Sequence, residues 1–537
     1  MTKASSSLAA IGPDRLATGL IDRADERHRN EHLQHLRGLG AVLVLLYHAA
    51  YYIGYLRGDQ SLAAVFPGYL GTYGVALFFV LSGYLMAAAS LDAPASRFLL
   101  DRIVRIYPLL MIVVALTIIG LWITGFPRRP DAVALLLAPA GVRDYMLGVE
   151  WTLLFEMTYY VLIASAMALR LRHLLTWAVA VWLVILATVS VFDWAPEQTL
   201  TPTLTALFGQ SANSAFLIGF LLHTLSAAAK QARSLAVALA MGALCVAAAT
   251  PSMPESAYRW LGALSAALLV MAALSAPPSG PSFGNRALSK LGDASYALYL
   301  VHVPFMLISH QILKNSLPAA MVFLLWICGP LVLALALTPL DRTLHQVLKA
   351  RVRAMPPRLA ASAAFGFALL FVGTSLYQQY RIEIAADALE RARRTHAAVP
   401  ATSRPSLLAA IDSAAILTDG RLIARGYAID LIAPDGDSHI VIEQMGRVVA
   451  MDRMTRMRPA IARSSNRSDL TDTRFGFAAV TETPLECHRG PLTAKVILSS
   501  NTVVAIDIGA AGLICPDAGA RPEATSLDGR PRAFQER

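Results

Sequence analysis

Two polar residues in the first long apolar segment are candidates for a chemical role because of their types and their spacing. Arg37 stands at the start of this segment, and His48 lies eleven residues further along. In a helix this separation makes about three turns, so both side chains would lie on nearly the same face, roughly 16 Å apart along the axis. Ionisable groups in membrane helices usually face a protein interior or a watery cavity, which makes both residues functional candidates. The alternative for Arg37 is a topology anchor at the membrane surface.

A cluster of arginines precedes the third apolar segment. Arg102 and Arg105 are three residues apart and would share a helix face, and Arg97 lies shortly before them. Guanidinium groups bind phosphate through a forked pair of donors, so a convergence of these arginines with Arg37 indicates a phosphate site. The alternative is anchoring at the membrane surface or binding of anionic lipid head groups.

Further polar groups lie within two later apolar segments. Glu156 lies nearly two turns inside the fourth, where a carboxylate needs a cation, a hydroxyl or a proton. Tyr299 and His302 are three residues apart in the ninth, and simple packing with hydrogen bonding would explain that pair. Ser82 and Gly83 in the second segment are small residues, which membrane helices use for close packing.

Composition indicates which elements must position these residues. The chain has 537 residues, of which 56% are hydrophobic and 15% are charged. Soluble proteins carry about a quarter charged residues, and the apolar residues here occur in blocks of about 20, long enough to cross a bilayer as helices. The net charge of +10 does not indicate a nucleic-acid partner, because the cations flank the apolar blocks, where they set orientation. Membrane lipids are the expected surroundings, and no metal site is expected.

The pattern predicts an α-helical polytopic membrane protein with about eleven transmembrane helices, followed by a small all-β sandwich-like soluble domain. An apolar patch at 132–140 is short and bounded by prolines, which favours a re-entrant or interfacial piece. The expected spans are 37–56, 69–90, 106–126, 149–169, 174–192, 204–226, 234–250, 257–276, 294–313, 318–338 and 359–379.

The basic residues predict the orientation of these spans. They are concentrated in alternate connecting segments, the last of which carries Arg342, Lys349, Arg351, Arg353 and Arg358. Under the positive-inside rule these segments are cytoplasmic. Residues 1–30 are polar, have no cleavable signal and are expected to be a cytoplasmic tail. An odd number of spans then places everything after residue 380 on the far side of the membrane; an even number would leave it in the cytoplasm.

The region after the last span has a different character. We expect a charged helix and linker at 381–405, a β-sandwich at 406–516 and a disordered tail at 517–537. Its only cysteines, Cys487 and Cys515, would form a disulfide if the domain is periplasmic, or remain buried thiols.

Five motifs together resemble the membrane acyltransferase-3 family, bacterial O-acyltransferases that modify exopolysaccharides, lipopolysaccharide O-antigen and related glycans. The motifs are Arg37 with His48, "FFVLSGYLM", "DRIVRIYP", "EWTLLFEMTYY" and "SYALYLVHVP", in the family's order. The resemblance covers about residues 30–345. It divides the chain into an acyltransferase domain of about ten helices at 31–345 and a cytoplasmic basic loop with the eleventh helix at 346–380. Glu150 departs from the pattern, since the family commonly has a small residue there.

The resemblance implies an acyl donor, usually acetyl-CoA, on the cytoplasmic side of the bacterial inner membrane and a glycan or lipid-linked glycan acceptor. Arg37, Arg102 and Arg105 match the arginines that would hold the CoA phosphates. His48 matches the essential histidine, as general base or transient acyl carrier. Glu156 would orient His48 or the acceptor. Three residues are candidates to line the acceptor path: Trp151, Tyr299 and His302.

Two questions stay open at the level of sequence. The tail domain contains Ala424–Asp430 and Arg474–Phe477, which loosely resemble β-sandwich modules attached to bacterial glycan enzymes, so it is expected to bind glycan or a partner protein. The rival to an enzyme is a transporter or flippase for a lipid-linked glycan or acyl intermediate, and a non-catalytic scaffold is a third possibility. The arginine cluster paired with His48 favours the enzyme, because a CoA site needs both and a flippase does not.

Overall fold

Helices make up most of the described chain as far as residue 396, and strands follow. The computed structural model describes residues 30–225 (except 142, 144, 193 and 195–198), a few positions between 236 and 243, residues 254–396 (except 278–281 and 315) and parts of 407–506. The chain divides into two compact units, Met1–Ile382 and Glu383–Arg537, which are described separately.

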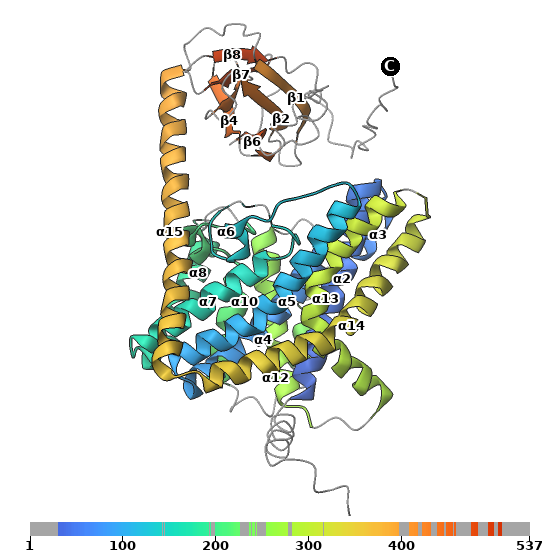
Figure 1. Ribbon diagram of the computed structural model, residues 1–537, viewed down its shortest axis with the longest axis vertical. Helices are drawn as coiled ribbons and strands as arrows, with labels where there is room; N and C mark the ends of the chain where they lie inside the picture. The colour runs from blue at the N-terminus through green and yellow to red at the C-terminus, as the bar shows by residue number, and fades with distance from the viewer. Residues whose placement is uncertain are drawn as a thin grey trace, which may run out of the picture. The chain divides into compact units, whose positions relative to one another are not determined.

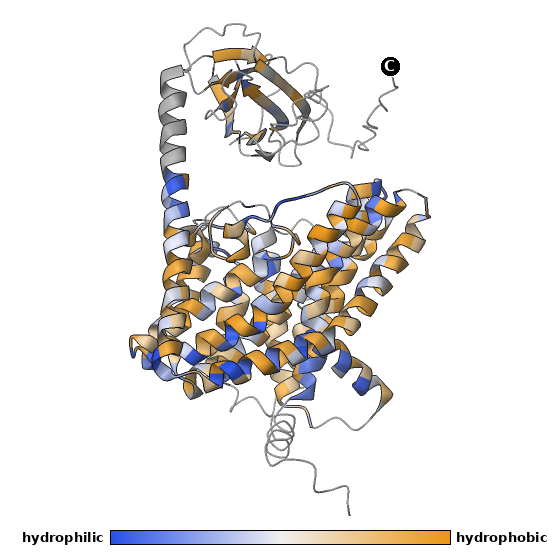
Figure 2. Cartoon of the chain, viewed as in Figure 1, coloured by the Kyte–Doolittle hydropathy of each residue, from blue (hydrophilic) through white to orange (hydrophobic). Residues whose placement is uncertain are grey.

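Long apolar helices build the first unit (Figure 1). Among the described residues, nine helices are long and apolar enough to cross a membrane. Figure 2 shows apolar residues along most of their length and hydrophilic residues toward their ends, as expected for helices whose middle faces lipid. This confirms the expected helical membrane fold. The helices are α2 (Glu31–Arg57), α3 (Ser61–Val65), α4 (Gly68–Asp92), α5 (Ala95–Ile123), α6 (Ala132–Leu135), α7 (Trp151–Ala168), η1 (Arg172–Leu174), α8 (Leu175–Val191), α9 (Leu204–Phe208), α10 (Asn213–Leu225), α12 (Glu255–Leu274), α13 (Phe283–Leu313), α14 (Ala319–Ala354) and α15 (Pro357–His396).

The span expected at 204–226 is broken. The structure has the short helix α9, a turn at 209–212 and then α10. Asn213 explains the break, because its buried side-chain amide donates to the carbonyl oxygens of Leu207 and Gln210 and its oxygen accepts from Tyr159. These bonds stabilise a non-helical turn inside the bundle. Most of the span expected at 234–250 lies outside the described residues.

Several helices continue well beyond their apolar stretch. α5 begins at Ala95, so the arginine cluster lies on its first three turns, and α13 begins eleven residues before the expected 294. α14 runs to Ala354, so the basic residues from 342 to 353, expected in a loop, form its last turns instead. α15 likewise continues to His396, where a separate short helix and the start of a linker were expected. Hydropathy marks only the part of a helix that suits lipid, whereas backbone hydrogen bonding carries the helix further.

Glycines bring α2 close to α13. A Cβ at Gly38 would lie 3.1 Å from the backbone nitrogen of Gly292, and a Cβ at Gly292 would collide with the carbonyl oxygen of Gln34. Small residues permit such close approach of membrane helices. His48 and His302 each lie ten residues after the glycine on their own helix, about 15 Å along its axis. The crossing therefore brings the two histidines to the same level of the bundle.

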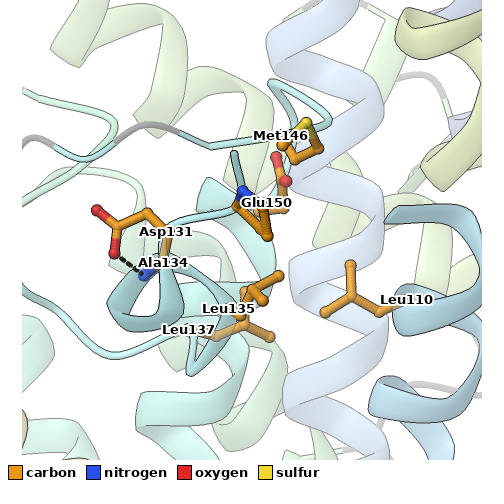
Figure 3. A pocket seen from close by; sticks show the side chains of 8 residues that line it. Leu110, Asp131, Ala134, Leu135, Leu137, Met146 and Glu150 are labelled. Atoms are coloured by element: carbon orange, nitrogen blue, oxygen red, sulfur yellow. Dashed lines mark hydrogen bonds between the residues drawn. The ribbon is translucent and has the colours of Figure 1, made fainter. Parts of the chain in front are cut away.

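The loop before α7 forms a small capped structure rather than a span. Asp131 caps α6 by accepting from the backbone N–H groups of Val133 and Ala134, and Figure 3 shows the bond to Ala134. Glu150 is 3% exposed, and its carboxylate accepts from the N–H groups of Leu147 (2.7 Å) and Val149 (3.1 Å). Burial raises the pKa of Glu150 above its usual value. The residue that departs from the family pattern therefore shapes the turn into α7.

The second unit is a pair of four-stranded antiparallel sheets with strand orders β1-β2-β6-β5 and β4-β3-β7-β8. Both sheets contribute to one apolar core, for example Phe477 and Ala424 from the first and Ile440 and Val496 from the second. This confirms the expected all-β domain. Cys487 and Cys515 lie outside the described residues, as does the tail at 517–537. The strands are β1 (Leu407–Ile416), β2 (Leu422–Asp430), β3 (His439–Gln444), β4 (Arg447–Arg453), β5 (Arg456–Met457), β6 (Arg474–Val480), β7 (Leu492–Ile497) and β8 (Val503–Ile506).

Candidate functional site

A cavity of about 310 Å³ lies within the helical unit, between α2, α4, α5, α7, α13 and α14. One part of its lining is basic and comes from three helices. The sequence-predicted Arg37, Arg102 and Arg105 meet there, as expected from their order and spacing. Two further residues complete this part of the lining: His345 and Lys349 of α14.

The arginines of α5 are positioned by specific contacts. Arg105 donates from Nη1 to Oδ2 of Asp341 at 2.7 Å, and its guanidinium lies 4.8 Å from the centre of the Tyr296 ring. Arg102 lies 5.7 Å from the centre of the Phe98 ring, and its buried Nε has no hydrogen-bond partner among the described residues. A guanidinium with an unsatisfied buried donor suits an incoming anion, because an unpaired buried donor is costly.

Glu156 lies on the same cavity. Its Oε2 accepts from the Tyr160 hydroxyl at 3.0 Å, and that hydroxyl lies 3.3 Å from Ser82 Oγ. Arg37 and Arg102 line the same cavity as this carboxylate. The deep carboxylate therefore has both the hydroxyl and the cations that its position in a membrane span requires.

Tyr299 also lines the cavity, whereas Trp151 is directed elsewhere. The Tyr299 hydroxyl donates to the Val149 carbonyl and accepts from Thr152 Oγ1, both at 2.8 Å. Trp151 packs against Phe79 and lies beneath the guanidinium of Arg259. Of these two acceptor-path candidates, the structure thus places Tyr299 at the cavity and Trp151 in a packing contact elsewhere.

His48 and His302 form a hydrogen-bonded pair. Nε2 of His302 lies 3.2 Å from Nδ1 of His48, and the ring centres are 5.0 Å apart. His302 is 1% exposed, whereas His48 is half-buried. Each Nδ1 also faces the carbonyl oxygen four residues earlier, Val44 for His48 and Leu298 for His302.

These partners determine where the protons lie. A carbonyl oxygen can only accept, so when each ring carries one proton, both rings hold it on Nδ1. His302 Nε2 is then an acceptor that shares the Nδ1 proton of His48 with the Val44 carbonyl. This arrangement leaves Nε2 of His48 unprotonated and able to take a proton from a substrate, which is the requirement for a general base.

Glu156 and His302 differ in whether they bond to His48. Glu156 was expected to orient the imidazole or the acceptor, and His302 to line the acceptor path. In the structure, the nitrogen of His48 that an orienting group would contact is bonded to His302, while Glu156 bonds to Tyr160. His302 therefore has the contact that the orienting carboxylate has in a nucleophile–histidine–acid arrangement.

Sequence reasoning missed the contribution of α14. Asp341, His345 and Lys349 follow one another at intervals of four residues, which places them on one helix face. This spacing was a usable signal. It was hidden because the segment is basic and follows an apolar span, a pattern that also marks a surface loop.

Comparison with known proteins identifies the family of the helical unit. A family model described as an acyltransferase domain matches residues 30–339, more than half of the chain. The match covers α2 to the proline-containing middle of α14 and ends shortly before Asp341. No curated protein and no solved structure gave a match. With its apolar helices and the matched domain, the chain belongs to the membrane acyltransferase-3 family and is a multi-pass membrane acyltransferase.

Proposed function

We propose that this acyltransferase moves an acetyl group from acetyl-CoA to a hydroxyl of a cell-surface or exported glycan. One observation carries the proposal: the same helix, α2, contributes an arginine to the basic lining of the cavity and carries the histidine whose Nε2 is unprotonated. Three arginines suit the phosphates of a nucleotide donor, and the free Nε2 suits the activation of a hydroxyl.

Arg37 and Arg102 bind the phosphates of the donor in this proposal. Arg105 contributes its remaining N–H donors, since one of its nitrogens is bonded to Asp341. The pantetheine arm then reaches from the cavity toward His48. Because Arg37 and His48 lie eleven residues apart on α2, the arm spans roughly 16 Å of helix axis between them.

The transfer step is direct in this proposal. As the acceptor oxygen attacks the thioester carbonyl, Nε2 of His48 takes the hydroxyl proton. An oxygen–carbon bond forms, the carbon–sulfur bond breaks, and His48 returns the proton to the departing thiolate. The imidazolium that exists between these events is stabilised by its Nδ1–H bonds to the Val44 carbonyl and to Nε2 of His302.

The proposed setting is the bacterial inner membrane, with the N-terminus in the cytoplasm and the β-sandwich unit in the periplasm. The basic ends of α5 and α14 support the cytoplasmic placement of the donor cavity. Thiol labelling of intact cells tests the orientation. Cys487 and Cys515 should react with an impermeant reagent from outside, and only after reduction if they form a disulfide; reaction only after lysis would contradict the periplasmic placement.

The activity test uses membranes containing the full chain and acetyl-CoA labelled in the acetyl group. Label should appear in the glycan fraction, and glycan O-acetyl content should fall in a deletion strain relative to its parent. Unchanged acetyl content together with altered glycan export would instead support the transporter alternative.

A further inference from the structure

The last turns of α14 form a part of the cavity that lies beyond the matched acyltransferase domain. The family match ends at residue 339, whereas α14 continues to Ala354. Asp341, His345 and Lys349 occupy one face of this extension, and the latter two line the cavity. The donor cavity is therefore completed by residues that the matched domain does not include.

The extension is held firmly against α5. Asp341 is 6% exposed, and its bond of 2.7 Å to Arg105 joins the two helices at the cavity wall. One turn further, His345 lines the cavity, and its buried Nδ1 has no hydrogen-bond partner among the described residues. One turn after that, Lys349 also lines the cavity.

Lys349 differs from the other cavity cations in its surroundings. Asp341 offsets the charge of Arg105, and Glu156 lines the cavity together with Arg37 and Arg102. Lys349 is half-buried, and the ion pairs among the described residues do not include it. It adds a positive charge to the cavity that no described carboxylate offsets at ion-pair distance.

Its position also sets Lys349 apart. It lies eight residues after Asp341, about 12 Å along the axis toward the end of the helix. There Arg351 and Arg353 are exposed, and α14 runs toward the end of the bundle where α15 begins (Figure 1). Along α14, Lys349 is therefore nearer than Asp341 to the exposed basic end of the helix.

We propose that Lys349 is a donor-binding residue that holds the 3′-phosphate of the CoA nucleotide. CoA carries its thioester at one end, its pyrophosphate in the middle and a phosphomonoester on the ribose at the other end. With the thioester directed toward His48 and the pyrophosphate at the arginines, the phosphomonoester at the other end of CoA reaches Lys349, the cavity cation nearest the end of α14. A lysine is suited to this group as a compact point charge with three donors.

This inference rests on acetyl-CoA being the donor, and the test separates the two claims. The full chain is placed in nanodiscs of phosphatidylcholine, which has no net charge, and binding of CoA and of 3′-dephospho-CoA is measured by calorimetry. Wild-type protein should bind CoA about tenfold more tightly than 3′-dephospho-CoA, the size expected for a hydrogen bond to a charged group. Lys349→Ala should weaken CoA binding by about the same factor and leave 3′-dephospho-CoA binding unchanged.

Two further variants complete the test. Lys349→Arg keeps the charge and should retain most of the preference for CoA. Arg351→Ala removes the same charge from the exposed side of the same helix and should change neither affinity. Equal binding of both ligands by the wild type, or equal weakening of both by Lys349→Ala, would overturn the assignment of Lys349. A preference for CoA that disappears when anionic lipid is added would show that a lipid head group occupies Lys349 in an anionic membrane and would also overturn it. Wild-type protein that binds neither ligand would overturn acetyl-CoA as the donor.

Discussion

The histidine pair and the basic cavity share α2 but satisfy their polar groups in different ways. At the pair, two imidazoles bond to each other and to carbonyls of their own helices, so the protein itself supplies the partners. In the cavity, cations from α2, α5 and α14 converge, and the buried Nε of Arg102 has no partner among the described residues. The difference is that the described protein groups satisfy the histidine pair, whereas the cavity keeps a buried donor that, in the proposed function, an anionic ligand would satisfy.

The largest effect should come from His48→Ala. Removing the base should lower acylation by about 10²–10⁴-fold, with protein level and membrane insertion unchanged, as measured by glycan O-acetyl content in cells. His310→Ala is a matched control, because it changes another histidine of α13 outside the pair. Acylation retained in the His48 variant would place the chemistry elsewhere.

His302→Phe tests whether the pair works as a unit. Loss of the acceptor for the Nδ1 proton of His48 should lower kcat by roughly 10–100-fold, in line with the effects of removing groups that orient a functional histidine, and leave the KM for acetyl-CoA unchanged. His302→Gln should recover part of the loss, because its amide oxygen can accept the same proton. A rise in KM with constant kcat would assign His302 to substrate binding instead.

Arg102→Ala should have the opposite kinetic signature. Losing a charged donor to phosphate should raise the KM for acetyl-CoA by roughly 10–100-fold, since such bonds contribute about 1.5–3 kcal/mol, with a small effect on kcat. Arg102→Lys should recover only part of the affinity, because an ammonium lacks the forked geometry. Arg97→Ala, on the same helix but outside the cavity lining, is the control. A fall in kcat as large as that of the His48 variant would contradict the assignment of donor binding to the cavity and of proton transfer to the histidine pair.

The smallest effect should follow from Asp341→Asn. Arg105 is 27% exposed, so breaking its pair should cost about 1–2 kcal/mol, less than the loss from a fully buried pair. The midpoint of thermal unfolding in detergent should fall by a few degrees. The double variant with Arg105→Ala should be no less stable than Asp341→Asn alone. An additive loss would show that the two residues act independently.

The sequence predicts the arginines of the cavity better than it predicts the histidine pair. The three-residue spacing of Arg102 and Arg105 predicts a shared helix face, and the positions of the basic segments predict that Arg37 lies at the same membrane surface. The family match supports the acyltransferase domain that contains them. The partner of His48 was not recognised, because His302 is 254 residues away and only the α2–α13 crossing brings the rings together. The sequence predicts a loop at Lys349, because hydropathy cannot show that a helix continues past its apolar stretch.

The sequence by itself determined the class of the molecule. Blocks of apolar residues long enough for a bilayer, the positions of the cations between them and five ordered motifs are local properties of the chain, and local properties can be read without coordinates. The tertiary structure decided which polar groups meet. The bond between His48 and His302, the contact of the Tyr160 hydroxyl with Ser82, and the pairing of Arg105 with Asp341 depend on helix crossings fixed by packing between distant segments. No local spacing encodes such crossings.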